Sequence, residues 1–300
     1  MYQQYLSELL NGSIRSLARC ISIVENEATG YEQLLEQLPS GSPTKVVGIT
    51  GPPGAGKSTL VNALIGQLLL QQKSIAIIAV DPSSPFNFGA LLGDRIRMSE
   101  HFNHPKVFIR SMASRGALGG LSPKIMEVSD LMRAAHFDYL FIETVGVGQS
   151  EVEIAGIADT TVVVVVPEAG DEIQTMKAGL MEIADIFIVN KADRESADSF
   201  VKNLRLLAHS KQQNDWEIPV IKSVATQQEG IHEIIDAISR HDKIASHQPQ
   251  KQVFLLAEKA WQLIQHRRMK DITKLQLQQE IQQLTTQRTF NLYRYISTKS

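Results

Sequence analysis

The stretch that decides the fold reads Gly51-Pro52-Pro53-Gly54-Ala55-Gly56-Lys57-Ser58-Thr59. It follows the apolar run 46–49 and precedes a helical pattern that begins near Lys57, which is the strand–loop–helix context of a phosphate-binding loop. The glycines allow backbone N–H groups to turn inward around a phosphate chain. Lys57 brings positive charge to the β- and γ-phosphates, and Ser58 offers a hydroxyl to Mg²⁺. The stretch therefore predicts a nucleoside triphosphate site.

A second motif, Asn190-Lys191-Ala192-Asp193, follows the apolar run 186–189 and indicates which base is bound. The Asp193 carboxylate can accept two hydrogen bonds from guanine N1–H and the exocyclic amine. Adenine lacks this pair of donors, and a desolvated carboxylate without partners is costly. We expect the Lys191 stem to cover the base plane and the Asn190 amide to tie neighbouring loops together. A third base-contacting loop is expected at Ser223-Val224-Ala225.

The composition is that of an ordinary globular protein, with 300 residues, 43% hydrophobic residues and a formal net charge of −2. This charge gives no reason to expect binding to nucleic acid or to a membrane. The single cysteine, Cys20, leaves no internal disulfide and is typical of a reducing compartment. No apolar run reaches membrane-spanning length, and the first residues lack a signal-peptide pattern. We therefore expect a soluble cytoplasmic protein.

The chain is predicted to have three parts: an N-terminal helical segment and linker (1–43), a nucleotide-binding domain (44–245) and a C-terminal helical extension (246–300). Between residues 44 and 245, apolar runs alternate with helical patterns, which predicts an α/β fold with a doubly wound, mostly parallel sheet of the P-loop NTPase type. The predicted strands are 45–50, 75–80, 106–110, 138–142, 161–166, 185–189 and 218–222.

The extension carries two amphipathic stripes in a glutamine-rich background, and the only strand signal after residue 251 is the aromatic tail 290–296. Helices this polar bury little surface alone. We expect them to pack on a second subunit and form a homodimer; the alternative is a helical cap on the chain's own sheet.

Three acidic residues near predicted strand ends are candidate Mg²⁺ ligands together with Ser58: Asp81, Asp94 and Glu143. Glu143-Thr144-Val145-Gly146 is similar to the switch loop whose glycine N–H senses a γ-phosphate. Lys57, Glu143 and Gly146 are therefore the expected catalytic residues. A long Gly- and Ser-rich loop is expected from Arg110 to Ser122. Candidates for transition-state or partner contacts, or simply solvated surface cations, are Arg95, Arg97, Arg110 and Arg115.

Five segments together resemble the MeaB/ArgK-type GTPases, which are accessory G-proteins of methylmalonyl-CoA mutase and related cobalamin-dependent acyl-CoA mutases. The segments are Val-Asp81-Pro-Ser-Ser, Gly93-Asp94-Arg-Ile-Arg-Met, Arg110-Ser-Met-Ala-Ser-Arg-Gly, Glu143-Thr-Val-Gly-Val-Gly-Gln-Ser-Glu151 and Asn190-Lys-Ala-Asp. The resemblance covers roughly residues 10–245.

The resemblance implies a homodimeric GTPase with slow intrinsic turnover that binds GTP, GDP and Mg²⁺. Such proteins gate the delivery of adenosylcobalamin to the mutase and protect or reactivate it. The resemblance also places Ser58, Asp81, Asp94 and Glu143 around Mg²⁺. It matches residues 167–177 to a switch that signals to the mutase, with Asp171, Gln174 and Lys177 as its coupling residues. The chain has no Asp-x-His-x-x-Gly cobalamin motif, so adenosylcobalamin is expected only through the partner.

Two alternative functions remain open. One is a transport-linked protein kinase, in which the γ-phosphate passes to a binding protein; the guanine motif argues against it. The other is a metal-insertion GTPase with a similar sheet. That class needs Cys and His clusters, whereas this chain has one cysteine and eight scattered histidines.

Overall fold

The computed structural model describes residues 2–81, 98–113, 121–146, 150–167, 178–209, 216–245, 249–269, 271–285 and 290–298. The chain divides into two compact units, Met1–Gln252 and Val253–Ser300. No helix in these ranges is both long enough and apolar enough to cross a membrane.

The first unit is built on a seven-stranded sheet with the order β3-β2-β4-β1-β5-β6-β7. Every pairing between neighbouring strands is parallel. All seven strand predictions are confirmed, with ends shifted by up to three residues. The strands are β1 (Lys45–Thr50), β2 (Ile75–Asp81), β3 (Val107–Ala113), β4 (Tyr139–Glu143), β5 (Thr160–Val165), β6 (Ile186–Asn190) and β7 (Val220–Ser223).

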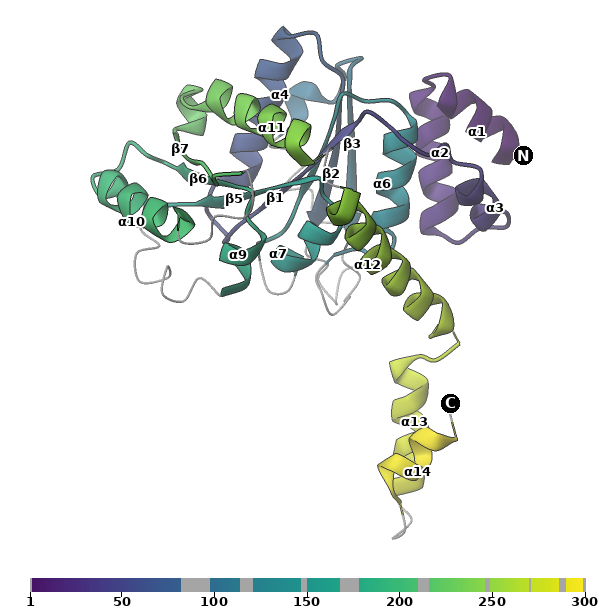
Figure 1. The fold of residues 1–300 in the computed structure, drawn as a ribbon. Coiled ribbons are helices and arrows are strands. Elements are labelled where there is room, and N and C mark those ends of the chain that lie inside the picture. The colour runs from purple at the N-terminus through teal and green to yellow at the C-terminus, as the bar shows by residue number, and fades with distance from the viewer. Residues whose placement is uncertain are drawn as a thin grey trace. The chain divides into compact units, whose positions relative to one another are not determined.

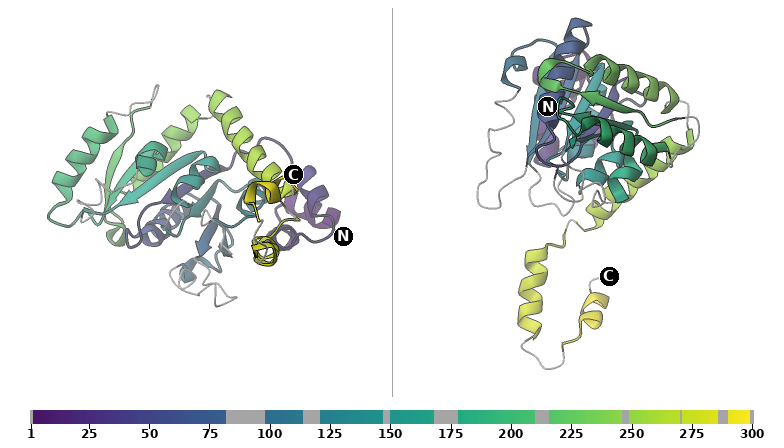
Figure 2. Two further views of the ribbon diagram at one scale, coloured as in Figure 1. Left: turned by 90° about the horizontal axis from the view of Figure 1, so that it is seen from below. Right: turned by 90° about the vertical axis from the view of Figure 1, so that its left-hand side faces the viewer.

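Helices cover both faces of the sheet, which explains why the central strands lack polar alternation. One face packs against α4 (Lys57–Leu70) and α11 (Ile231–Ala245). The other face packs against α6 (Ile125–Ala134), α9 (Ala178–Ile183) and α10 (Ala197–His209). Figure 1 shows α4 and α11 on one side of the sheet and α9 and α10 on the other, and Figure 2 shows the twist of the strands. Val162 and Val163 of β5 accordingly lie in different apolar clusters.

Three N-terminal helices form a group that packs on α6 through α2 (Figure 1). They are α1 (Tyr2–Leu10), α2 (Ile14–Glu25) and α3 (Tyr31–Glu36). Cys20 is fully buried in α2, as expected for a core residue, and burial raises the pKa of its thiol to about 11. A short helix, α7 (Ser150–Glu153), follows the loop after β4.

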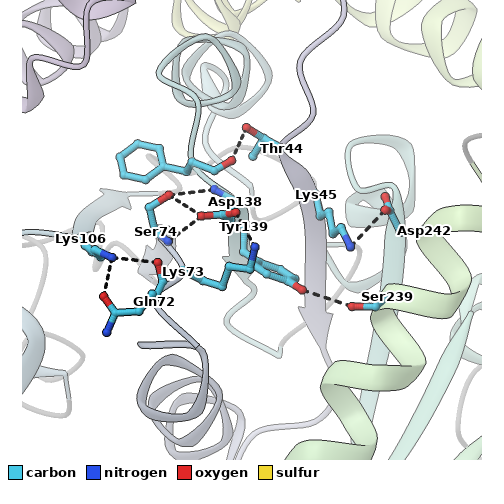
Figure 3. A network of polar contacts seen from close by, with 11 residues as sticks. Thr44, Lys45, Gln72, Lys73, Ser74, Lys106, Asp138, Tyr139, Ser239 and Asp242 are labelled. Atoms are coloured by element: carbon cyan, nitrogen blue, oxygen red, sulfur yellow. Dashed lines mark hydrogen bonds and ion pairs between the residues drawn. The ribbon is translucent and has the colours of Figure 1, made fainter. Parts of the chain in front are cut away.

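Polar contacts close the amino-terminal edge of the sheet, away from the phosphate-binding loop (Figure 3). The Asp138 carboxylate, just before β4, accepts hydrogen bonds from the Ser74 backbone N–H at 2.8 Å and from Lys73 Nζ at 3.0 Å. Tyr139 and Lys45 reach α11 through Ser239 and Asp242 respectively. These contacts fix how the strands enter the sheet.

The second unit contains most of α12 (Pro249–Arg268), then α13 (Lys274–Thr285) and α14 (Leu292–Ser297). The strand signal of the aromatic tail 290–296 is wrong, because this segment forms α14. The Asn291 side chain caps the helix by accepting from the Arg294 N–H at 3.1 Å. The Tyr295 hydroxyl donates to Glu280 of α13 at 2.6 Å, so the two helices form a hairpin.

Candidate nucleotide-binding site

The phosphate-binding loop (residues 51–56) connects β1 to α4 at the carboxyl edge of the sheet. Gly51 and Gly56 have φ angles of +137° and +87°, which residues with a side chain rarely adopt. A Cβ on Gly51 would lie 2.0 Å from the Val164 carbonyl oxygen, and one on Gly56 would lie 2.5 Å from Asn190 Nδ2. Both positions therefore require glycine, because neighbouring strands approach the loop so closely.

Lys57 connects the loop to the segment that follows β4. Its side chain is buried, and Nζ donates to the carbonyl oxygens of Gly51 at 2.8 Å and Pro52 at 3.1 Å. Nζ also lies 3.4 Å from the carbonyl oxygen of Val145. The ammonium is thus held by backbone oxygens within the phosphate-binding loop.

Ser58 and Glu143 meet beside this ammonium. The Ser58 hydroxyl, in the first turn of α4, donates to Glu143 Oε1 at 2.6 Å, and each residue is only 6% exposed. Glu143 is the last residue of β4, which lies between β1 and β2 in the sheet. Asp81 ends β2, two residues beyond the Ala79–Glu143 pairing. Oxygen ligands of this kind are those that Mg²⁺ prefers.

The predicted switch glycine lies directly against the phosphate-binding loop. Thr144 extends the contact between β4 and β1 through a hydrogen bond from its N–H to the Ile49 carbonyl at 3.0 Å. Gly146 has a φ of +92°, and a Cβ there would lie 2.5 Å from both the Gly51 oxygen and Lys57 Nζ. A side chain at Gly146 would therefore push the segment away from the loop.

Asn190 ties three loops together, as the sequence led us to expect. Its Nδ2 donates to the Ala55 carbonyl at 2.9 Å, and its Oδ1 accepts from the Ser223 hydroxyl and the Ala225 N–H at 3.2 Å each. Asn190 is 3% exposed. The base-recognition loops and the phosphate-binding loop are thereby joined through one amide.

The two charged residues of the guanine motif differ in their surroundings. Lys191 has a φ of +57°, and its Nζ donates to the Gly54 carbonyl at 2.9 Å. Asp193 is exposed, three residues beyond the end of β6. The carboxylate therefore lies open to a ligand at the same edge of the sheet as the phosphate-binding loop.

Several predicted residues fall outside the described residues. They are Asp94, Asp171, Gln174, Lys177, Arg95, Arg97 and Arg115, and for Asp81 the description stops at its backbone. Arg110 does not begin a loop as expected. It lies within β3 and forms an ion pair with Glu25 of α2, so it attaches the N-terminal helices to the sheet.

The sequence did not predict the contact between Lys57 Nζ and the Val145 carbonyl, which joins the phosphate-binding loop to the segment after β4. A backbone oxygen leaves no trace in residue type, so no motif signals it. It also missed the hydrogen bond between the hydroxyls of Thr144 and Thr50, 3.0 Å apart and both fully buried, which locks the ends of β4 and β1 together.

Comparison with known proteins gives consistent matches over most of the chain. The family model described as methylmalonyl Co-A mutase-associated GTPase MeaB matches residues 17–280. A putative GTPase of Pyrococcus abyssi is 48% identical over 246 residues, which cover 80% of this chain and 76% of that protein. The mitochondrial methylmalonic aciduria type A homolog of Mus musculus is 33% identical over 297 residues, covering 88% and 70%.

Among solved structures, the crystal structure of a LAO/AO transport system kinase has a TM-score of 0.68 and 25% sequence identity with this chain. The match covers 99% of this chain and 95% of the other. The doubly wound P-loop architecture predicted from the sequence is thus found in a related protein over nearly its whole length.

Proposed function

The chain belongs to the family of methylmalonyl-CoA mutase-associated GTPases (MeaB), and from this premise we propose that it is the GTP-hydrolysing accessory protein of a cobalamin-dependent acyl-CoA mutase, most simply methylmalonyl-CoA mutase. The resemblance drawn from its motifs is thereby confirmed, and so is its assignment as a GTPase. In the proposed function, the nucleotide state gates delivery of adenosylcobalamin and protects or reactivates the mutase.

The observation that carries this proposal is the contact of the segment 143–146 with the phosphate-binding loop. Lys57 Nζ lies within 3.4 Å of the Val145 oxygen, and Gly146 leaves no space for a Cβ beside it. A γ-phosphate that attracts the Lys57 ammonium competes with these carbonyl oxygens. The contact with Val145 is the longest of the three and should be lost first, so we expect the position of the segment to depend on the nucleotide.

The fold of a P-loop GTPase implies binding of GTP or GDP and of Mg²⁺. We assign the cation to Ser58 and Glu143, with Asp81 and Asp94 as further oxygen ligands, held directly or through water. The adjacent buried oxygens of Ser58 and Glu143 fit a hard divalent cation. When bound, Mg²⁺ neutralises charge on the β- and γ-phosphates. Lys57 and the loop N–H groups would orient the phosphates, and Gly146 would donate its N–H to the γ-phosphate.

Guanine selectivity is assigned to Asp193, with Lys191 alongside and residues Ser223, Val224 and Ala225 closing the base site. In the remaining part of the proposal, Asp171, Gln174 and Lys177 couple the nucleotide state to the mutase. Adenosylcobalamin reaches the complex through the mutase.

Homodimer formation is assigned to the C-terminal unit. Its helices expose large apolar side chains, including Val253 at 66%, Leu256 at 65%, Trp261 at 60% and Leu275 at 65%. Such exposure over two helices supports the assignment of a protein–protein surface to this unit. Deleting residues 253–300 should give a nucleotide-binding monomer by light scattering, and a monomeric full-length chain would contradict this assignment.

The decisive experiment measures GTP turnover with and without a cobalamin-dependent acyl-CoA mutase from the same source. The isolated protein should hydrolyse GTP slowly, on the order of 10⁻⁴–10⁻² s⁻¹, and the mutase should accelerate it. Lys177→Ala should retain GTP affinity and lose the acceleration, whereas the exposed-surface control Lys202→Ala should keep both. If no such mutase stimulates the parent protein or binds it differently with GTP and GDP, the accessory function is wrong.

A second candidate function, phosphoryl transfer to a transport protein, is favoured by the similarity to the crystal structure of a LAO/AO transport system kinase. Incubation with γ-labelled GTP distinguishes the two. Label released as inorganic phosphate supports hydrolysis, whereas label transferred to a binding protein supports the kinase. No observation favours the metal-insertion alternative: within the described ranges, no group of three His, Cys, Asp or Glu side chains is placed to hold a metal.

A further inference from the structure

A groove of about 880 Å³ lies at the outer edge of the sheet, where β7 is the last strand. Its walls are the last turns of α10 and α11, and its floor is formed by residues 216–220, which lead into β7. These are the amino-terminal end of β7 and the carboxyl-terminal ends of the helices. The groove therefore lies at the end of the parallel sheet opposite the phosphate-binding loop, and the nucleotide site does not use it.

The rim of the groove is cationic. Arg205 stands on α10, while Arg240 and Lys243 stand on α11. Glu217 is the one carboxylate among the lining residues of the described chain, and its Oε1 lies 3.9 Å from His209 Nδ1. Arg240 Nε forms an ion pair at 3.0 Å with Asp236, an exposed residue one turn earlier on α11. The rim thus carries more positive than negative charge, on both sides of β7.

The floor is apolar and firmly held. Trp216, Ile218 and Val220 line it. The Trp216 indole N–H donates to the Asp185 carbonyl at 2.8 Å, and its ring meets the His241 ring edge-on with centroids 5.0 Å apart. His241 is itself buried, with Nδ1 2.8 Å from the Thr160 hydroxyl and Nε2 3.2 Å from Asp185 Oδ1. An aromatic surface fixed in this way loses little entropy when a ligand packs on it.

We propose that this groove docks an acidic linear segment of a partner protein, with a bulky apolar side chain against Trp216 and carboxylates at Arg205, Arg240 and Lys243. Charge complementarity at a rim around an apolar, aromatic centre is the usual anatomy of such an interface. Because α10 and α11 cover opposite faces of the sheet, the cations stand apart on two walls, which suits an extended chain.

A single phosphate group fits this groove less well. Small phosphates are typically held by the N–H groups of a helix N-terminus. Here the lining helices contribute their last turns, so they offer no such N–H groups to the groove. The cations are also distributed between two helices instead of converging on one point. An extended peptide with several carboxylates can reach both walls.

Docking here should not depend on the nucleotide. The elements that contact the phosphate-binding loop lie at the carboxyl ends of the strands, and the groove lies at their amino ends. We therefore expect equal peptide affinity with GDP and with a GTP analogue. This expectation separates the groove from the GTP-gated contact in the proposed function, so either can fail alone.

The experiment uses Trp216 as its own reporter. The chain has two tryptophans, so Trp261→Phe leaves Trp216 as the sole indole. Random short peptides are selected by display on the full-length protein, then synthesised and titrated while Trp216 fluorescence is followed. Selected peptides should be enriched in Asp and Glu around an apolar residue and should change the fluorescence saturably.

The variant Arg205→Gln/Arg240→Gln/Lys243→Gln, which removes the three positive charges of the rim, should weaken peptide binding by about tenfold, as expected for three exposed charge pairs. The matched control Arg15→Gln/Arg19→Gln/Lys202→Gln removes equal charge from exposed positions elsewhere and should bind like the parent. Thermal melts check that both variants fold. Peptides without acidic enrichment, no selected peptide at all, or equal loss in both variants would overturn the proposal. Saturable quenching by pyrophosphate that displaces the peptides would assign the groove to a small anion and overturn it too.

Discussion

Replacing Asn190 by alanine should uncouple the base-recognition loops from the phosphate-binding loop. The change removes the hydrogen bond to the Ala55 carbonyl and those from the Ser223 hydroxyl and the Ala225 N–H. Each is worth about 1 kcal/mol net, so about 3 kcal/mol is at stake. The amide is only 3% exposed, so little water replaces these partners in the folded protein.

The free energy lost in Asn190→Ala should be divided between the stability of the folded protein and its binding of GDP. The three loops lie at the carboxyl edge of the sheet and reach the apolar core only through the small side chains of Ala55 and Ala225, so we expect about 1 kcal/mol in the free energy of unfolding. The remaining ~2 kcal/mol should appear in GDP binding, as a dissociation constant about 30-fold higher. Urea unfolding of the ligand-free protein measures the first quantity, and calorimetric titration with GDP measures the second.

Two variants serve as controls. Asn190→Asp keeps an acceptor for Ser223 and Ala225 but has no donor for Ala55, so it should impair GDP binding more than stability. Ser223→Ala removes one bond of the three and should have about a third of the alanine effect. If Asn190→Ala unfolds at the parent's urea concentration and binds GDP within twofold, this amide does not connect the two halves of the site energetically.

Three other predictions follow from buried or strained positions. Gly146→Ala places a methyl 2.5 Å from the Gly51 oxygen, so single-turnover GTP hydrolysis should fall about 100-fold, while GDP affinity should be nearly unchanged. At Asp138, burial raises the pKa but hydrogen bonds led by the Ser74 N–H outweigh it and hold the pKa below its usual value. The ionised carboxylate therefore stabilises the fold at pH values above the pKa of the unfolded chain, and this stabilisation is lost as the pH falls through the pKa of the folded protein. In urea titrations, Asp138→Asn should lower the free energy of unfolding by about 0.5 kcal/mol at pH 7 and should not change it in strong acid. The Cys20 thiol, with its pKa raised to about 11, should react with a disulfide reagent only after unfolding.

The sheet was predictable because its strands carry their own signal. A parallel strand buried on both faces must be apolar along its whole length, and Thr160–Val165 shows no alternation at all. The phosphate-binding motif indicated the position and direction of β1. Because the strands are parallel, the carboxyl ends of the other strands were expected at the same edge of the sheet. Asn190 was also foreseeable, since a buried amide between loops needs several partners.

Two features of the described chain could not be predicted from residue type: the ion pair of Arg110 and the helix in the aromatic tail. Arg110 read as a loop cation, yet β3 extends to Ala113 and turns this residue toward Glu25 of α2. The tail 290–296 read as a strand because aromatic residues favour strands. Its Asn291 is a helix N-cap, and that local hydrogen bond outweighs a weak preference for a strand. In both cases the deciding partner was either remote in sequence or a backbone group.

The order of the strands also determines how a nucleotide must lie on the sheet. The phosphate-binding loop leaves β1, Asn190 ends β6, and β5 lies between them, so loop and base motif are two strand spacings apart, roughly 10 Å. Glu143 ends β4, on the other side of β1. A triphosphate that starts at a base over β6 and β7 therefore ends with its γ-phosphate toward β4 and β2. The segment 143–146 is then the part of the described chain that meets the group removed by hydrolysis, because no other strand end borders β1 on that side.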